Sequence, residues 1–224
     1  MKKFKFEVKD IPMGRERGWK VLINGEEHRV KKVEITSKYG TLTYGLRPEG
    51  YDGLTLHVPG GGGSVTLPYT VSPYGELLVA LVHEQRDNLS DKPVWCAIGG
   101  FVDPGESHSD AQVRKTAEEA GLDSVTASPF TGPPIVADRL FFVADILAGE
   151  GNHLYSLNVP FSMLEFDKAG KEVKSWKIKN SALLKGFRNG DAVRFFDWRD
   201  AVRITPDSLA LSPIAKLAAS VLPS

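Results

Sequence analysis

The chain has 224 residues, of which 42% are hydrophobic and 25% are charged, so it falls in the ordinary globular range and is long enough for one large domain or two small ones. Disordered and fibrous proteins are therefore not expected. The 28 Lys and Arg residues balance the 28 Asp and Glu residues, and such a neutral chain lacks the basic field that drives nonspecific binding to nucleic-acid polymers or anionic membranes.

The first residues alternate apolar side chains with charges and lack the continuous apolar core of a signal peptide. No later run approaches the roughly 18 apolar residues that a membrane-spanning segment needs. We therefore expect a cytoplasmic protein. The single cysteine, Cys96, excludes an internal disulfide and a cysteine-rich zinc site, and its apolar neighbours predict a buried strand position.

The first sixty or so residues predict a small antiparallel β unit. Turn signals at Asn24-Gly25, Tyr39-Gly40 and Asp52-Gly53 separate short runs of alternating apolar residues, which is typical of hairpins. The predicted strands are 19–23, 29–35, 41–46 and 54–58. The expected organisation is an N-terminal β unit over residues 1–64 and a second domain over residues 65–224.

Four glycines in succession, Gly60 to Gly63, stand near the boundary between these units. They are too flexible for a regular element and lack the Gly-Lys-Ser/Thr ending of a phosphate-binding loop. The sequence therefore predicts a linker or a hairpin tip at this point.

From residue 65 the pattern mixes strands with two clear helices. Strands are predicted at 65–71, 76–82, 94–98, 139–146 and 193–196, and a last helix at 212–221, with Pro213 in its first turn. Residues 159–188 are charged and irregular, and this insert could be a lid. The mixture predicts an α/β (α+β) fold in which helices cover a mixed sheet.

The other helix follows the turn at Asp103-Pro104-Gly105. Ser107 and Asp110 have the spacing of a capping box, and Gly121 occupies the position of a left-handed C-terminal cap. Val113, Ala117 and Ala120 predict a narrow apolar stripe that packs against the sheet.

Lys115, Glu118 and Glu119 lie on the neighbouring face of this helix. Two adjacent carboxylates repel each other unless a cation joins them, and hard oxygen ligands suit Mg²⁺ or Mn²⁺. Taken alone, a Glu-Glu pair more often consists of solvated surface charges. The surrounding spacing favours the metal-binding interpretation.

That spacing resembles the Nudix box: a glycine, five residues, a glutamate, seven residues, then Arg-Glu-hydrophobic-any-Glu-Glu-any-Gly-hydrophobic. The residues that match it in position and type are Gly100, Glu106, Arg114, Glu118, Glu119, Gly121 and Leu122. The resemblance implies a Nudix α/β/α sandwich with a mixed sheet over residues 65–224.

Three further segments resemble the ADP-ribose pyrophosphatase branch of that family. They are the strand that ends in His83-Glu84-Gln85-Arg86, the approach to the box from Trp95, and the run from Arg194 to Trp198 before the last helix. The resemblance implies a divalent-metal-dependent hydrolase of a phosphoanhydride bond in a nucleoside diphosphate derivative of the ADP-ribose or nucleotide-sugar type. Because an N-terminal β unit helps build a homodimer in that branch, a homodimer is one candidate assembly.

The resemblance also assigns roles to residues of this chain. Glu118 and Glu119 would be side-chain ligands of Mg²⁺ or Mn²⁺, the backbone carbonyl of Gly99 a further ligand, and Arg86 a substrate-binding residue. Glu106 and Arg114 would form a structural ion pair between the loop and the helix, and Gly100 and Gly121 would be structural. In such a site, cations neutralise phosphate charge and lower the pKa of the attacking water.

One position departs from the family in a way that affects chemistry. Lys115 replaces the first glutamate of the Arg-Glu pair, and Thr116 follows in place of a hydrophobic residue. The formal charge of the three side chains at 115, 118 and 119 changes from −3 to −1. Weaker metal binding is the expected consequence.

Three alternatives stay open for this position. In the first, another carboxylate completes the site from a neighbouring strand or loop, since the family often uses one such downstream acid. The candidates are Glu84, Glu150, Glu165 and Glu172. Alternatively, the enzyme uses fewer metals and Lys115 takes a catalytic role by contacting phosphate oxygens as a point charge. In the third alternative catalysis is weakened or lost, which leaves a nucleotide-binding or sensor protein.

Overall fold

The computed structural model describes residues 6–10, 19–30, 32–37, 40–46, 52–57, 61–86, 90–130, 151–167, 173–185 and 192–221. The predicted strand at 139–146 lies outside these residues, as do two of the candidate carboxylates, Glu150 and Glu172.

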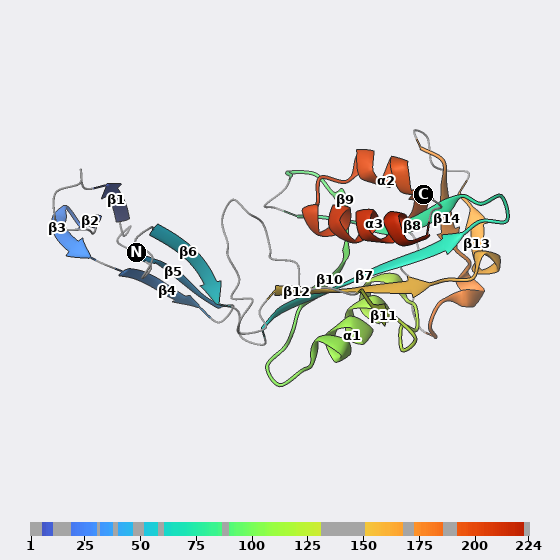
Figure 1. The fold of residues 1–224 in the computed structure, drawn as a ribbon, viewed down its shortest axis with the longest axis horizontal. Helices are drawn as coiled ribbons and strands as arrows, with labels where there is room; N and C mark the ends of the chain where they lie inside the picture. The colour runs from blue at the N-terminus through green and yellow to red at the C-terminus, as the bar shows by residue number, and fades with distance from the viewer. Residues whose placement is uncertain are drawn as a thin grey trace.

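Two three-stranded antiparallel sheets make up the described N-terminal part (Figure 1). The first contains β1 (Phe6–Asp10), β2 (Trp19–Ile23) and β3 (Glu26–Val30), and the second contains β4 (Lys32–Ser37), β5 (Gly40–Leu46) and β6 (Asp52–His57). The predicted turn at Asn24-Gly25 is confirmed: both residues have positive φ, 52° and 91°, as a two-residue hairpin loop of the favoured type requires. The antiparallel β unit is thus present.

Two local predictions in this part are wrong. The run predicted as one strand over 29–35 is divided between β3 and β4. Asp52-Gly53 lies inside β6 instead of forming a turn, and pairs there with Leu46 and Gly45 of β5. Pairing along the whole of β5 overrides the local turn preference of Asp-Gly, because turn propensity is a weak term beside a complete ladder.

A nine-stranded mixed sheet forms the centre of the larger part of the chain. Its strands are β7 (Gly62–Val71), β8 (Leu77–Glu84), β9 (Val94–Cys96), β10 (Ile98–Phe101), β11 (Ser128–Pro129), β12 (Gly151–Asn158), β13 (Leu164–Phe166), β14 (Ser175–Ile178) and β15 (Val193–Asp197). The order is β11-β12-β7-β8-β15-β14-β13, with β10 beside β7 and β9 beside β8. β12 and β7 are parallel while the other described pairs are antiparallel, so the predicted mixed sheet is confirmed.

Helices cover both faces of this sheet (Figure 1). α1 (His108–Ala120) lies on one face, and α2 (Trp198–Ile204) and α3 (Ser208–Val221) lie on the other. Alternate residues of β8 supply the two cores: Leu78, Ala80 and Val82 pack on the α1 side, and Leu77, Val79 and Leu81 pack on the α3 side. The predicted α/β/α arrangement is confirmed.

The predicted boundaries differ at three places. The strand expected at 94–98 is interrupted at Ala97, which separates β9 from β10. The last helix begins at Ser208 instead of 212, so Pro213 lies inside it, and α2 was not predicted at all. Part of the insert expected to be irregular forms β13, β14 and two short 3₁₀ helices, η2 (Phe161–Met163) and η3 (Asn180–Ala182).

Gly62 and Gly63, the second half of the glycine run, are part of the sheet, which corrects the linker prediction for these two residues. Gly62 and Gly63 are the first residues of β7 and pair with Gly151 and Asn152 of β12. A Cβ on Gly62 would overlap the backbone of Gly151, and one on Gly63 would overlap the side-chain oxygen of Asn152. Glycine is needed here because the two backbones approach too closely for a side chain.

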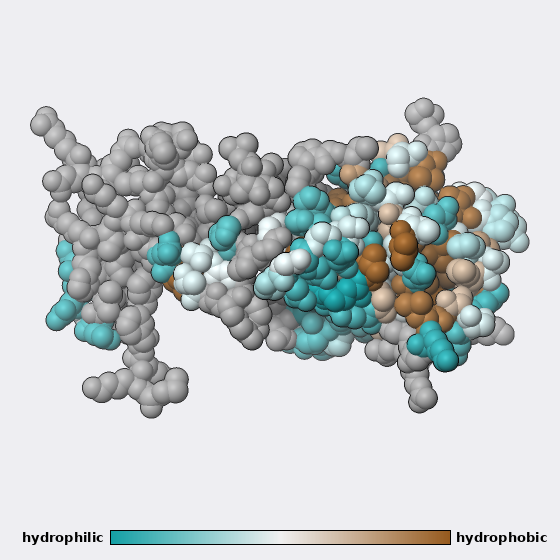
Figure 2. Space-filling model, turned by 90° about the horizontal axis from the view of Figure 1, so that it is seen from below, coloured by the Kyte–Doolittle hydropathy of each residue, from teal (hydrophilic) through white to brown (hydrophobic). Residues whose placement is uncertain are grey.

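The surface over α1 is hydrophilic. Figure 2 views the molecule from that side and shows hydrophilic residues gathered where the helix lies. Among the helices that the structure describes, none combines the length and apolar character needed to cross a membrane.

Candidate active site

Local hydrogen bonds define both ends of α1. Ser107 Oγ accepts from the Asp110 N–H (3.1 Å), and Asp110 Oδ2 accepts from the Ser107 N–H (3.3 Å), so the predicted capping box is present. Gly121 has φ 64° and donates its N–H to Ala117 O, which is the predicted left-handed cap. These two caps set the register of the helix and therefore the directions of residues 115, 118 and 119.

The buried face of α1 is more polar than the predicted apolar stripe. The buried residues are Ala111, Gln112, Thr116 and Ala120, whereas Val113 and Ala117 are only partly buried. Thr116 Oγ1 donates to Thr66 Oγ1 of β7 (2.8 Å), and Gln112 Nε2 donates to Thr116 Oγ1 (3.4 Å). A polar residue can occupy this position because the sheet supplies a hydroxyl partner for it.

An ion pair ties the loop before α1 to the helix. Arg114 donates from Nε to Glu106 Oε1 (2.8 Å) and from Nη2 to Glu106 Oε2 (2.7 Å). Glu106 also accepts from the Asp103 N–H, and Arg114 also reaches Asp103 and the Phe101 carbonyl. The hydrogen bonds from Arg114, with that from Asp103, lower the pKa of Glu106 to about 2. This bidentate pair fixes the Asp103–Glu106 loop against α1.

Glu119 points from α1 to the neighbouring strand β10. The backbone N–H of Gly99 donates to Glu119 Oε2 (3.0 Å). Burial raises the pKa of Glu119 to about 7, although the Gly99 hydrogen bond opposes this, and the negative charge of Glu84 raises it further. Glu119 is thus a carboxylate that changes its protonation near neutral pH.

Glu84 is the last residue of β8, and Arg86 lies two residues after it. Arg86 Nε donates to Glu84 Oε1 (2.7 Å), and Arg86 Nη2 lies 2.5 Å from the same oxygen. Both charges act on the pKa of Glu119, so the end of β8 belongs to the same site as α1 and β10. Glu165, another candidate carboxylate, lies on β13 and pairs with Lys177 (3.1 Å). Of the candidates that the structure describes, Glu84 is therefore the one coupled to Glu119.

Lys115 and Glu118 pair on the outer side of α1. Lys115 Nζ donates to Glu118 Oε2 (3.0 Å), and Arg114 Nη1 lies 3.6 Å from that oxygen. The stem of Lys115 crosses Gly100: a Cβ at Gly100 would stand 2.8 Å from Lys115 Cε and 3.2 Å from Lys115 Cδ. Glu118 and Glu119 are adjacent in sequence but have different partners. Glu119 accepts from the Gly99 N–H, whereas Glu118 pairs with the Lys115 ammonium.

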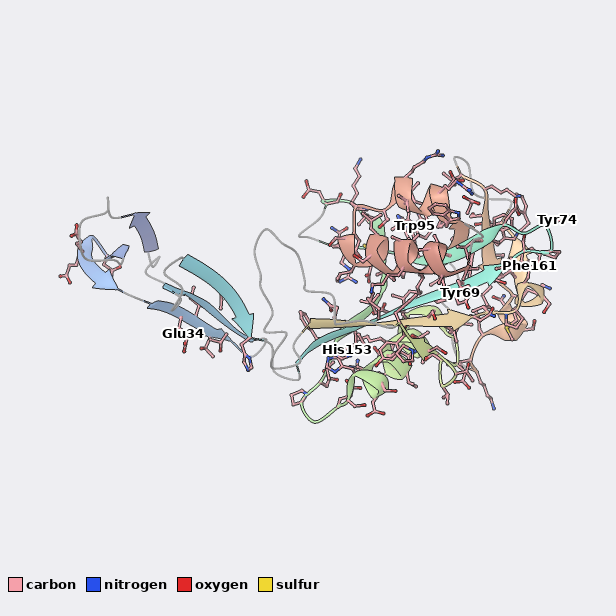
Figure 3. All side chains as sticks on the ribbon, viewed as in Figure 1. Glu34, Tyr69, Tyr74, Trp95, His153 and Phe161 are labelled. Carbon is pink, nitrogen blue, oxygen red and sulfur yellow. The ribbon has the colours of Figure 1, made fainter. Side chains whose placement is uncertain are left out.

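Two residues that the sequence did not single out hold the strand connection beside this site. Asp207 Oδ2 accepts from the Ala97 N–H (3.0 Å), and Thr205 Oγ1 donates to the Trp95 carbonyl (2.8 Å). Trp95 lies on the side of α2 and α3 (Figure 3), where it packs edge-on against Phe196. The run Thr205-Pro206-Asp207 is a helix-start signal that could have located the cap of α3. The contact between Asp207 and Ala97 cannot be predicted from the neighbouring sequence.

The donor set agrees only partly with a divalent-metal centre. Glu84 raises the pKa of Glu119 by its negative charge, and a divalent cation would relieve this repulsion. Within the described ranges, no group of three or more His, Cys, Asp or Glu side chains is arranged to hold a metal ion. The positive charge of the Lys115 ammonium would repel a second cation placed beside it.

One family model matches a stretch of the chain that contains this site. The family model of the NUDIX domain matches residues 70–177. This range includes the end of β8 and the whole of α1, and thus Glu84, Arg86, Lys115 and Glu119. None of the curated proteins matches the chain.

Three solved structures illustrate the fold-level comparison. A mutT/nudix family protein from Listeria innocua is 20% identical, with 74% of this chain and 96% of that chain covered and a TM-score of 0.47. The NUDIX domain of Shewanella oneidensis NrtR, complexed with ADP ribose, is 14% identical, with coverages of 72% and 88% and a TM-score of 0.46. The C. elegans Ap4A hydrolase is 17% identical, with coverages of 72% and 98% and a TM-score of 0.44.

Proposed function

Starting from the NUDIX domain at residues 70–177, we propose that the chain hydrolyses a phosphoanhydride bond in a nucleoside diphosphate derivative, of the ADP-ribose or nucleotide-sugar type, with Mg²⁺ or Mn²⁺ as cofactor. The observation that carries this proposal is the Glu119 carboxylate, which the Gly99 amide holds and which Glu84 and Arg86 influence. Perturbed carboxylates in a cluster of opposite charges are candidates for catalytic residues.

Glu119 and Glu84 would hold the divalent cation, with the carbonyl of Gly99 as a further ligand. When bound, such a cation neutralises phosphate charge and lowers the pKa of water. The resemblance assigns a ligand role to Glu118 as well, but its Oε2 accepts from Lys115, so we assign Glu118 to the positioning of that ammonium.

The chain's own groups supply the remaining chemistry. Because burial raises the pKa of Glu119 to about 7 in the metal-free chain, a bound cation would favour the ionised carboxylate that serves as its ligand. The Arg86 guanidinium can bind phosphate oxygens in a bidentate way once it exchanges Glu84 for the substrate. The Glu106–Arg114 pair keeps the loop before α1 in place during these exchanges.

The test is turnover of a panel containing ADP-ribose, nucleotide sugars, dinucleoside polyphosphates and nucleoside triphosphates, each with Mg²⁺ or Mn²⁺. We expect hydrolysis of at least one diphosphate derivative, and a large loss of kcat for Glu119→Gln, because the charge of a cation ligand is removed while the shape is kept. Glu165→Gln is the matched control, since Glu165 pairs with Lys177 away from the site, and should leave kcat unchanged. Folded protein without turnover on the whole panel would refute the enzyme proposal.

The second candidate function is a weakened or inactive NUDIX domain that binds a nucleotide derivative as a sensor. The observation that favours it is the Lys115–Glu118 pair, which puts a cation where the box has a carboxylate. It predicts binding of ADP-ribose by calorimetry without hydrolysis, and appearance of activity in Lys115→Glu. A wild-type activity that Glu119→Gln abolishes would contradict it.

A further inference from the structure

We propose that Lys115 is a diphosphate-binding residue, whose ammonium takes a phosphate oxygen at the position where a second divalent cation would otherwise act. The inference rests on the proposed function for the identity of the ligand, a nucleoside diphosphate derivative. It does not require that the chain hydrolyse this ligand.

The path of the Lys115 side chain supports the inference. Its stem crosses Gly100, where the absent Cβ leaves room for Lys115 Cδ and Cε. Gly100 follows Gly99, whose N–H holds Glu119, so the lysine stem runs beside the strand that positions the buried carboxylate. Only 25% of the Lys115 side chain is exposed. The stem packs over Gly100 while the ammonium lies at the surface beside Glu118, as is usual for a lysine that keeps its charge in contact with solvent.

The present partner of the ammonium is one that a ligand can replace. Glu118 is 50% exposed, and it binds both Lys115 Nζ at 3.0 Å and Arg114 Nη1 at 3.6 Å. Exposed ion pairs contribute little net free energy, whereas a phosphate oxygen carries more charge and accepts several hydrogen bonds. A diphosphate can therefore take Lys115 from Glu118 while Arg114 continues to hold that carboxylate.

The charges of the two carboxylates support the same arrangement. Glu84 and Glu119 are two acidic groups that act on each other, and among the described residues no third His, Cys, Asp or Glu is arranged with them to hold a metal ion. A second charge on the ligand must then be neutralised by side chains, and Lys115 and Arg86 are the cations of this site whose charges act on Glu119. Part of the binding affinity should therefore persist without any divalent metal.

The experiment is calorimetric titration of the full chain with ADP-ribose, and separately with inorganic pyrophosphate, in EDTA and in Mg²⁺. In EDTA we expect measurable binding by the wild type, a Kd weakened about tenfold or more in Lys115→Met, and a near-wild-type Kd in Lys115→Arg. Lys177→Met is the matched control, because Lys177 pairs with Glu165 at 3.1 Å in another partly exposed ion pair, on β13 and β14, and its Kd should not change.

Gly100→Ala tests the same inference while keeping every charge. The new methyl group would stand 2.8 Å from Lys115 Cε, the flexible part of a side chain, so the lysine must move and the backbone need not. We expect the Kd in EDTA to weaken as in Lys115→Met, with an unchanged melting temperature. This variant keeps the charge of Lys115 but moves it, so it tests whether the position of the ammonium matters for binding.

The outcomes distinguish this inference from the proposed function. Binding in EDTA that Lys115→Met weakens, together with no turnover on any substrate, supports the inference and refutes the hydrolase. Turnover with an unaltered KM in Lys115→Met refutes the inference and leaves the hydrolase intact. A wild type that binds neither ADP-ribose nor pyrophosphate in EDTA, with or without binding in Mg²⁺, overturns the inference.

Discussion

Among single side chains, Glu106 has the largest downward pKa shift in the candidate site. Its hydrogen bonds with Arg114 and Asp103 keep its pKa at about 2, below the usual value of 4.5. A carboxyl group with a lowered pKa stabilises the folded state above the unfolded pKa, and that contribution is lost as the pH falls toward the folded pKa. Glu106 should therefore contribute fully at pH 7 and progressively less from pH 4.5 to about 2.

Glu106→Gln tests this dependence. At pH 7 the variant should melt at a lower temperature than the wild type, and the difference between the two melting temperatures should shrink as the pH is lowered from 5 to 3. Asp91→Asn, at an exposed position between β8 and β9, is the control and should show no such trend. A difference that is constant from pH 7 to pH 3 would show that the charge of Glu106 is not the source of its effect.

Residue identity alone predicted some of the site, and the fold supplied the rest. The replacement of a box glutamate by Lys115 is visible in the sequence. The contact of the Lys115 side chain with Gly100 is not, because it depends on how β10 packs against α1. Of the two candidate acids that the structure describes, the sequence could not tell that the charge of Glu84 acts on Glu119 while Glu165 pairs with Lys177. Thr116 contradicted the apolar pattern since its partner, Thr66, lies on another element.

Among the elements, the junction between α2 and α3 supports the strands next to the site. Asp207 is only 8% exposed, and its carboxylate accepts from the N–H groups of Ala97 and Leu209, so it caps α3 and holds the connection between β9 and β10. Gly99, which binds Glu119, follows two residues after Ala97. One carboxylate therefore links a helix start to the strand that positions a catalytic candidate.

Asp207→Ala should lower the free energy of unfolding by about 2 to 4 kcal/mol, because it removes a helix cap and leaves the Ala97 N–H buried without an acceptor. Asp207→Asn should lose less, since its one carbonyl oxygen can satisfy one of the two N–H groups. Urea unfolding measures both variants against Ser208→Ala, a neighbouring exposed position that should remain near wild type. Equal losses for Ala and Asn would show that the one hydrogen bond retained by Asn contributes nothing.

Elements with local start and stop signals were predicted well. α1 has Ser107, Asp110 and Gly121 at its ends, and its bounds follow from them. For α3, Pro213 suggested a start several residues too late, because the actual cap, Asp207, precedes the apolar run. Gly62 and Gly63 were interpreted as a linker since the strand that they approach, β12, is distant in sequence.

At the scale of the whole molecule, the two N-terminal sheets bear on assembly. Each has three strands, with outer strands β1 and β3 in one and β4 and β6 in the other (Figure 1). Outer strands offer backbone groups for pairing with another chain. We therefore expect the full chain to form a homodimer through this unit.

Light scattering on the full chain and on a chain that starts at residue 58 tests this expectation. The second chain keeps all of β7, which begins at Gly62, and should be a monomer while the full chain is a dimer. The melting temperature of the shorter chain serves as the folding control. A full chain that is monomeric at every concentration, or a shortened chain that remains dimeric, would contradict the role assigned to the N-terminal sheets.

The parallel pairing of β7 with β12 also has a consequence for the order in which the molecule forms. Gly62 of β7 pairs with Gly151 of β12, so one edge of β7 is completed only by a strand roughly ninety residues further along the chain. During translation, β7 can pair with β8 and β10 long before β12 leaves the ribosome, and its other edge stays open in the meantime. Closing so long a loop is slow, which makes this pairing a candidate for the rate-limiting step of folding. Until β12 pairs, the open edge of β7 is exposed to aggregation.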